Sequence, residues 1–96
     1  MRIISLRRLR ECWTEHPDAE AALRSWYRVV HQARWQRFMD VRTHYSSADQ
    51  VGKFTVFNIA GNKYRLVVRA NYTYRILYVR FVGTHREYDE IDATEV

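Results

Sequence analysis

Residues 53–83 read KFTVFNIAGNKYRLVVRANYTYRILYVRFVG, and this stretch decides the fold class. It is rich in Val, Ile, Phe and Tyr, the residue types that favour β-strands. Residues 54–59 predict one strand, and Gly61-Asn62 predicts a tight turn because both residues accept positive φ angles. Residues 63–70 and 75–82 predict two further strands, and Thr84 is the expected cap of a short helical turn through Glu87 and Tyr88. Three consecutive strands joined by short turns indicate an antiparallel meander.

The N-terminal half of the chain has mainly helical periodicity. A short strand is expected at residues 2–5, and Ser5 is the expected cap of a helix that follows it. A second helix is predicted over residues 17–32, because Pro suits the first helical position and the apolar residues then recur on one face. From Trp35 the sequence predicts one or two more helical turns, which end before Tyr45, and residues 46–52 predict a loop.

These elements predict a single α+β domain over residues 1–96, in the order β-α-α-β-β-β, with an antiparallel sheet covered by helices on one face. Side chains alternate along a strand, so the uncovered face is expected to present Lys63, Arg65, Arg69 and Arg80 together. In the last strand, alternation places Leu77, Val79 and Phe81 on one face and Tyr78, Arg80 and Val82 on the other.

The positive charge is concentrated in the body of the chain. The 96 residues carry 16 Lys and Arg against 11 Asp and Glu, for a formal net charge of +5. All sixteen bases but only six of the acids precede residue 87, which gives that part a net charge of +10. Such a surface suits a nucleic acid or an acidic protein, although it also serves for solubility alone. The cluster Arg7, Arg8 and Arg10 is expected on the solvent face of the first helix, where it would serve an acidic partner equally well.

Composition also indicates where the protein acts. A single cysteine, Cys12, excludes an internal disulfide and fits a reducing compartment. The first fifteen residues lack the apolar segment and cleavage site of a secretory signal. No apolar run approaches the roughly 20 residues that a membrane-spanning helix needs. We therefore expect a soluble, cytoplasmic protein without a membrane partner.

A basic patch beside a histidine is what RNA cleavage without a metal requires. The 2′-hydroxyl must lose a proton, cations must stabilise the charge that develops at phosphorus, and an acid must protonate the leaving 5′-oxygen. His85 comes directly after the last strand and can transfer protons near neutral pH. Tyr72, Tyr74 and Tyr88 offer aromatic faces on which unpaired bases could stack.

The residue types alone leave three functions open: a ribonuclease, a protein that binds RNA without cutting it, and a scaffold for an acidic protein. Alternating basic residues are common on a solvated strand face, and a histidine at a strand end is often an ordinary surface residue. The other histidines show no spacing with Cys12 that predicts zinc, and no glycine-rich phosphate loop is present. We therefore expect no metal and no cofactor, and we interpret the acidic residues from Asp89 onward as a solvated tail.

Several segments, in this order and spacing, resemble the HigB toxin family. In the C-terminal half they are Val56–Ile59, Gly61–Leu66, Asn71-Tyr72, Phe81–His85 and Glu87–Asp89. In the N-terminal half they are Arg2–Ser5, Leu9-Arg10, Trp13, His16–Glu20 and Trp26-Tyr27. The resemblance therefore covers essentially the whole chain.

The resemblance implies the toxin of a type II toxin–antitoxin system, with a fold similar to RelE. Such toxins are mRNA interferases, endoribonucleases that commonly cut message on the translating ribosome. The implied partner is a HigA-type antitoxin with a helix-turn-helix domain, and operator DNA is expected to bind only the complex with this antitoxin. The alternative is a non-catalytic RNA- or ribosome-binding module that inhibits translation by occupancy.

The resemblance also implies site residues. RelE-like toxins place basic residues on the sheet, and a His or Tyr near the C-terminus, at the scissile phosphate. Matched by motif, the implied catalytic residues are His85, Arg65, Lys63, Arg80 and Tyr88. His85 is the strongest of these, because Gly83-Thr84-His85 matches in full, while the assignment of acid and base stays open. The less specific matches, expected to bind RNA, are Arg69, Arg75, Asn71 and Tyr72.

Overall fold

The C-terminal half of the chain forms the predicted meander. The computed structural model describes residues 1–91, in which β3 spans Phe54–Ile59, β4 spans Tyr64–Asn71 and β5 spans Ile76–Thr84. β4 is the middle strand of the three and pairs antiparallel with both neighbours. The pairing of β4 with β5 runs the full length of β4 and is the longest in the sheet.

Two short strands extend this meander into a mixed sheet of five strands, in the order β1-β5-β4-β3-β2. β1 (Arg2–Ile4) pairs parallel with β5, so the prediction of an all-antiparallel sheet was wrong for this pair. The helices and the other strands of the sheet separate β1 from β5 in sequence, so no tight turn requires the two strands to be antiparallel.

The second addition is β2 (Asp49–Val51), which pairs antiparallel with β3 where a loop was predicted. The two strands are joined by only two residues, Gly52 and Lys53, and Gly52 has a φ of 60°. A glycine with positive φ is what a two-residue hairpin needs at this position. In the β3–β4 turn the positive φ angles fall on Ala60 (53°) and Gly61 (72°), one residue earlier than predicted.

The helices follow the predicted order, including the short helical turn expected after Thr84. They are α1 (Leu6–Glu15), a short 3-10 turn (Pro17–Ala19), α2 (Glu20–Gln32), α3 (Phe38–His44) and α4 (His85–Asp89). Ser5 does not cap α1: it has a left-handed φ of 77°, and its side chain makes no capping hydrogen bond. Among the described residues, no helix combines the length and apolar character needed to cross a membrane.

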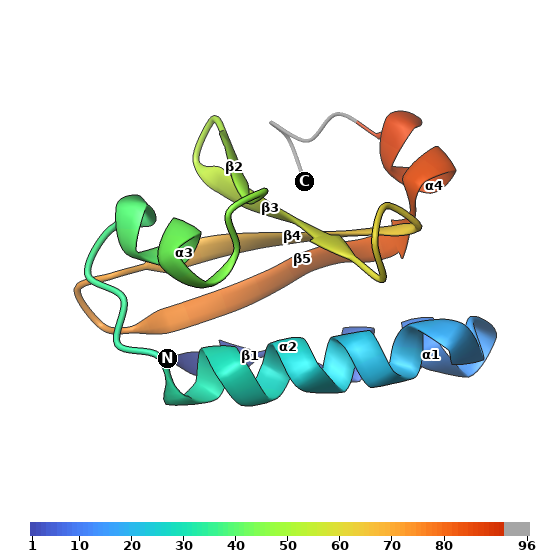
Figure 1. Ribbon diagram of the computed structural model, residues 1–96, viewed down its shortest axis with the longest axis horizontal. Helices are drawn as coiled ribbons and strands as arrows, with labels where there is room; N and C mark the ends of the chain where they lie inside the picture. Colours follow the sequence, from blue (N-terminus) through green and yellow to red (C-terminus); the bar gives the residue numbers. More distant parts are fainter. Residues whose placement is uncertain (92–96) are drawn as a thin grey trace.

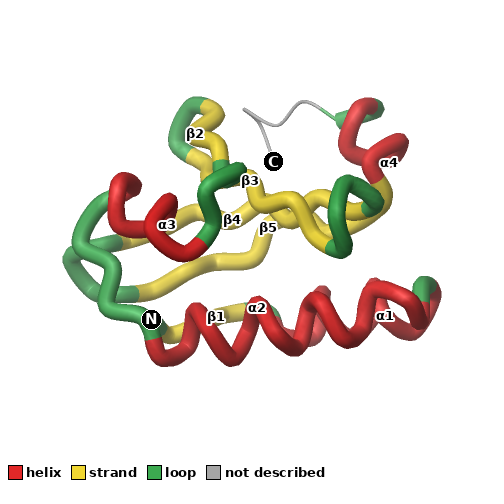
Figure 2. The backbone as a smooth tube through the Cα atoms, viewed as in Figure 1, coloured by secondary structure: helices red, strands yellow, loops and turns green. Residues whose placement is uncertain are grey.

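α1 and α2 lie side by side along one face of the sheet, and α4 lies on the other side of it (Figure 1). Figure 2 shows the same arrangement, with the two long helices beneath the strands. The ammonium group of Met1 donates to the carbonyls of Val30, His31 and Ala33, at 3.2, 3.2 and 2.7 Å. These carbonyls lie at the C-terminal end of α2, where the helix dipole favours a positive charge, so this contact holds β1 against the helix. We call the sheet face turned away from α1 and α2 the open face.

The main core lies between the helices and the sheet, and Phe57 is at its centre. The ring of Phe57 makes edge contacts with Trp26 and Tyr45, at centroid distances of 5.4 and 5.3 Å, and stacks on Trp35 at 6.4 Å. Offset and edge geometries of this kind stabilise aromatic clusters beyond their buried area. A second, smaller cluster lies on the open face and consists of Phe54, Val56 and Val67, with Val51, Phe81 and Tyr88 packed against it.

One residue of β5, Arg80, has no partner on β4. Val67 pairs with Phe81, but the next residue of β4, Val68, pairs with Val79. This arrangement is a β-bulge, in which two residues of one strand lie opposite one residue of the other. The guanidinium of Arg8 on α1 donates to the carbonyl of Arg80 at 3.1 Å, which supplies a partner for a backbone group at the bulge.

The bulge reverses the faces of the side chains that follow it. Phe81 packs in the open-face cluster and Val82 packs against the main core. The predicted faces of both residues were wrong, because strict alternation assumes that the ladder of pairs is uninterrupted.

We expect Phe57→Ala to lower the free energy of unfolding by about 3–5 kcal/mol, because it removes the ring around which three other aromatic rings pack. Denaturant unfolding followed by tryptophan fluorescence measures this loss. Tyr74→Ala is the matched control: Tyr74 is 74% exposed, and its loss should change stability by no more than about 0.5 kcal/mol. Equal effects of the two substitutions would contradict this account of the core.

Candidate active site

α4 is fixed to the end of β5 by a capping box. The side-chain oxygen of Thr84 accepts from the backbone N–H of Glu87 at 3.1 Å, and the Glu87 carboxylate accepts from the N–H of Thr84 at 2.8 Å. These bonds lower the pKa of Glu87, chiefly through the backbone N–H of Thr84, so the carboxylate stays ionised in this role. The prediction that Thr84 caps a short helix here is confirmed.

Gly83 leaves the space that this cap needs. It is buried and lies opposite Arg65 in the β4–β5 ladder. A Cβ at this position would lie 2.9 Å from Glu87 Oε1 and 2.9 Å from Phe81 Cζ. Residue 83 must therefore be glycine for reasons of space, so that the capping carboxylate and the ring of Phe81 can both approach the strand.

His85 is the first residue of α4, and the helix provides it with a carboxylate partner. Its Nδ1 lies 3.0 Å from Oδ2 of Asp89, one helical turn later. Its backbone N–H donates to the carbonyl of Lys63 at 3.0 Å. The side chain remains 49% exposed. An imidazole that donates from Nδ1 to Asp89 keeps Nε2 available to a substrate, so the geometry suits proton transfer.

Tyr88 lies on the same side of α4 as His85, one turn along the helix. Its ring contacts Phe81 at a centroid distance of 6.5 Å and is half-buried against the open-face cluster. Tyr88 thus anchors α4 on the open face. This packing fixes the orientation of the helix that carries His85.

Three arginines of the open face extend along the sheet from the start of this helix. Arg65 lies opposite Gly83. Among residues 1–91 its guanidinium makes only long hydrogen bonds of 3.4 Å to neighbouring backbone carbonyls, which leaves donors for a ligand. Arg69 lies opposite Tyr78, and the guanidinium of Arg80 lies 5.9 Å from the Tyr78 ring. A shallow groove of about 480 Å³ is lined by Arg69, Tyr78 and Arg80, among others. Two guanidinium groups in one groove suit the phosphates of a nucleic-acid strand.

The alternation pattern predicted that Lys63 would lie with these arginines, but it does not. It belongs to the β3–β4 turn, and its ammonium lies 3.5 Å from a carboxylate oxygen of Asp18, beside the helical layer. Asp18 also accepts a hydrogen bond from the hydroxyl of Tyr64, which raises the pKa of Tyr64 to about 12 and, with Lys63, lowers the pKa of Asp18. The predicted face for Lys63 was wrong, because strand alternation does not extend into a turn.

The remaining predicted RNA-binding residues lie at the other end of the sheet. Asn71 pairs with Ile76 at the far end of β4, seven residues and roughly 23 Å from the Tyr64–Thr84 pair beside α4. Asn71 accepts the N–H of Tyr74 through its side chain, which shapes the turn, and Tyr72 packs against the main core. Arg75 is exposed, with a left-handed φ of 57°. The structure therefore separates these residues from His85, but Asn71 and Tyr72 line the groove that Arg69 and Arg80 also line.

Comparison with known proteins identifies the family. The HigB toxin family, described as the RelE-like toxic component of a toxin–antitoxin system, matches residues 19–91. The chain belongs to this family. It is also 29% identical over 94 residues to the mRNA interferase HigB of Escherichia coli O6:H1 (strain CFT073), an alignment that covers 95% of this chain and 91% of that protein.

Two features of the site in this toxin were not predicted from the sequence. Asp89 was interpreted as part of a solvated tail, yet its carboxylate meets His85. The four-residue spacing on a predicted helical turn was the signal that could have found it. Tyr78 was placed on the same face as Arg80, but no pattern predicted that its ring would lie beside two arginines.

Other chemistries find little support in the part of the toxin that the structure describes. Residues 1–91 bring no three His, Cys, Asp or Glu side chains together in a way that could hold a metal ion. Cys12 is buried in the main core, and burial raises the pKa of its thiol to about 11. A thiol with that pKa is protonated at neutral pH and is a poor nucleophile.

We expect Gly83→Ala to disrupt the cap of α4, because the new methyl group and the Glu87 carboxylate cannot both fit. Loss of the capping box should lower the free energy of unfolding by about 1–2 kcal/mol. Amide hydrogen exchange should show faster exchange in α4, while β4 stays protected. Unchanged protection of α4 would contradict the role assigned to Gly83.

Proposed function

We propose that this toxin is an mRNA interferase, a metal-independent endoribonuclease whose active site is formed by α4 and the open face. The observation that carries the proposal is the pair His85–Asp89, with Nδ1 and Oδ2 at 3.0 Å, on a capped helix that begins where Arg65 meets Gly83. Membership of the HigB toxin family and the named activity of the Escherichia coli relative support it.

The proposed reaction is an attack within the RNA itself. The 2′-oxygen loses its proton and forms a bond to the neighbouring phosphorus, and the bond from phosphorus to the 5′-oxygen breaks. The leaving 5′-oxygen takes up a proton, so the products are a 2′,3′-cyclic phosphate and a 5′-hydroxyl. His85 performs one of the two proton transfers through Nε2, and Tyr88 is the candidate for assisting the other.

Charge stabilisation is assigned to the arginines of the open face. Arg65 is the nearest of them to α4 along the sheet, and we assign it to the scissile phosphate. Arg80 lies three residues before Gly83, roughly 10 Å along the strand, so Arg80 and Arg69 fit neighbouring phosphates of the same RNA. The ammonium of Lys63 is already paired with Asp18, and we assign Lys63 a supporting role through its carbonyl bond to His85.

The biological setting follows from the family. A toxin of this kind acts together with an antitoxin, and we propose that the antitoxin is of the HigA type, with a helix-turn-helix domain. We propose that the toxin cuts message in the cytoplasm on the translating ribosome, and that operator DNA binds only the toxin–antitoxin complex. Asn71, Tyr72 and Arg75 stay candidates for contacts with RNA distant from the cleavage site.

His85→Ala should abolish growth arrest and lower the cleavage rate by roughly 100- to 10,000-fold, the usual contribution of a general acid or base. Mapping the 5′ ends of transcripts after induction measures cleavage directly. Arg86→Ala is the matched control, because Arg86 is the next residue of α4 and its side chain is 91% exposed. The control should cut message as the wild type does.

Two outcomes would overturn parts of this proposal. If the wild type stops growth but creates no new 5′ ends, the protein inhibits translation by occupancy and is not a nuclease. If His85→Ala and Arg65→Ala both remain fully toxic, cleavage takes place elsewhere on the molecule.

Asp89→Asn should lower kcat by about tenfold or more and leave KM nearly unchanged, because Asp89 positions the imidazole and does not contact the RNA. Single-turnover cleavage of a short RNA by purified toxin separates the two constants. Glu90→Gln is the control, since its only ion pair among residues 1–91 is the long 4.0 Å contact with Arg86. A rise in KM with kcat unchanged would show that Asp89 acts in binding instead.

A further inference from the structure

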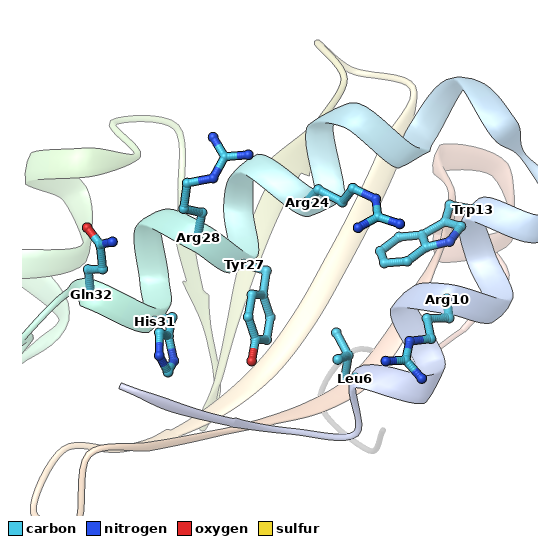
Figure 3. A pocket seen from close by; sticks show the side chains of 8 residues that line it. All are labelled: Leu6, Arg10, Trp13, Arg24, Tyr27, Arg28, His31 and Gln32. Carbon is cyan, nitrogen blue, oxygen red and sulfur yellow. The ribbon is translucent and has the colours of Figure 1, made fainter.

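The helical layer carries a groove that the proposed active site does not use. It lies between α1 and α2, on the helices that cover the opposite face of the sheet, and has a volume of about 400 Å³ (Figure 3). Trp13 of α1 and Tyr27 of α2 are half-buried and form part of its lining. Arg10, Arg24, Arg28 and His31 surround them (Figure 3).

The charge of this groove is entirely positive. None of the residues that line it is acidic. Arg24 is paired with Glu20 at 2.7 Å, but Arg10 and Arg28 have no carboxylate within 4.0 Å among residues 1–91. Two exposed and unpaired guanidinium groups beside apolar surface suit a ligand that carries both carboxylates and an apolar side chain.

The aromatic rings of the groove argue against RNA as that ligand. The guanidinium of Arg24 lies over the Trp13 ring at 4.8 Å, and the imidazole of His31 stacks on Tyr27 at 5.7 Å with an interplanar angle of 6°. A ring face that another side chain already covers is not free to stack on a base. The covered faces reduce the stacking surface for RNA bases, whereas the remaining surface of these half-buried rings can still contact an apolar side chain.

We propose that this groove binds an acidic segment of the antitoxin, with an apolar side chain of that segment seated against Trp13 and Tyr27. A second copy of the toxin is disfavoured as the occupant, because residues 1–86 of each copy carry a net charge of +10. The inference rests on the proposed function, since it takes the antitoxin to be the partner of this chain. It implies that antitoxin can be bound on the face of the molecule opposite His85.

The test is the double substitution Arg10→Glu/Arg28→Glu, which reverses both unpaired charges of the groove. Arg34→Glu/Arg37→Glu is the matched control, with the same change of charge at two exposed arginines outside it. The probe is the purified product of the gene that neighbours the toxin gene. Affinities are measured by titration calorimetry, with the toxins in a His85→Ala background so that they can be produced alone.

We expect the groove variant to lose at least about 30-fold in affinity for the antitoxin, while the control loses less than about threefold. Raising the salt concentration should weaken the wild-type complex more than that of the groove variant. Hydrogen exchange of the wild-type complex should show new protection at residues 6–13 and 24–32. In cells, the groove variant with His85 intact should remain toxic and escape neutralisation.

Equal affinities of the groove variant and the wild type, without protection of the two helices, would overturn the inference and leave the proposed nuclease activity untouched. If the groove variant loses toxicity but still binds the antitoxin fully, the inference is wrong and the groove contacts RNA instead. If the wild type self-associates and the groove variant does not, the occupant of the groove is a second copy of the toxin. If the wild type cuts no RNA, the nuclease proposal fails, while the calorimetric comparison still decides whether the groove binds this partner.

Discussion

The pairing of β4 with β5, with a bulge at Arg80, is the constraint on which the rest of the molecule depends. Before the bulge, Leu77 and Val79 face the helices and complete the main core. After it, Phe81 and Gly83 lie on the open face, opposite Val67 and Arg65. A strand without the extra residue would direct positions 81 and 83 toward α1 and α2, and α4 would then lack the surface on which it packs.

The geometry around His85 follows from this reversal through short, local steps. Gly83 leaves space for the Glu87 carboxylate, Glu87 and Thr84 cap the helix, and the helix brings Asp89 to the imidazole of His85. Each step is a contact within one turn of helix, so the arrangement is rigid although α4 has only five residues. Tyr88 joins this local structure to the sheet by packing on Phe81.

The basic charge of the chain is divided between two surfaces that face opposite ways. Arg65, Arg69 and Arg80 belong to the open face, whereas Arg10 and Arg28 flank the groove between α1 and α2. In the groove, Arg24 lies over the Trp13 ring and His31 stacks on Tyr27, and on the open face Arg80 lies over the Tyr78 ring. The proposed RNA target and the antitoxin can therefore contact separate surfaces.

Local sequence predicted the elements and their order except for β2, because periodicity and capping are encoded within a few neighbouring residues. Residues 54–59, 63–70 and 75–82 have the residue types of strands, residues 17–32 repeat with a helical period, and Thr84 caps the last helix as its local sequence indicates. The pattern of Gly83-Thr84-His85 also pointed to the family and to His85.

Which side chains meet could be seen only in the folded structure. Four features depend on backbone register or on where a turn directs a side chain. They are the bulge at Arg80, the parallel pairing of β1 with β5, the pairing of Lys63 with Asp18 and the approach of Asp89 to His85. Alternation along a single strand contains no information about that register, because it treats every residue as paired.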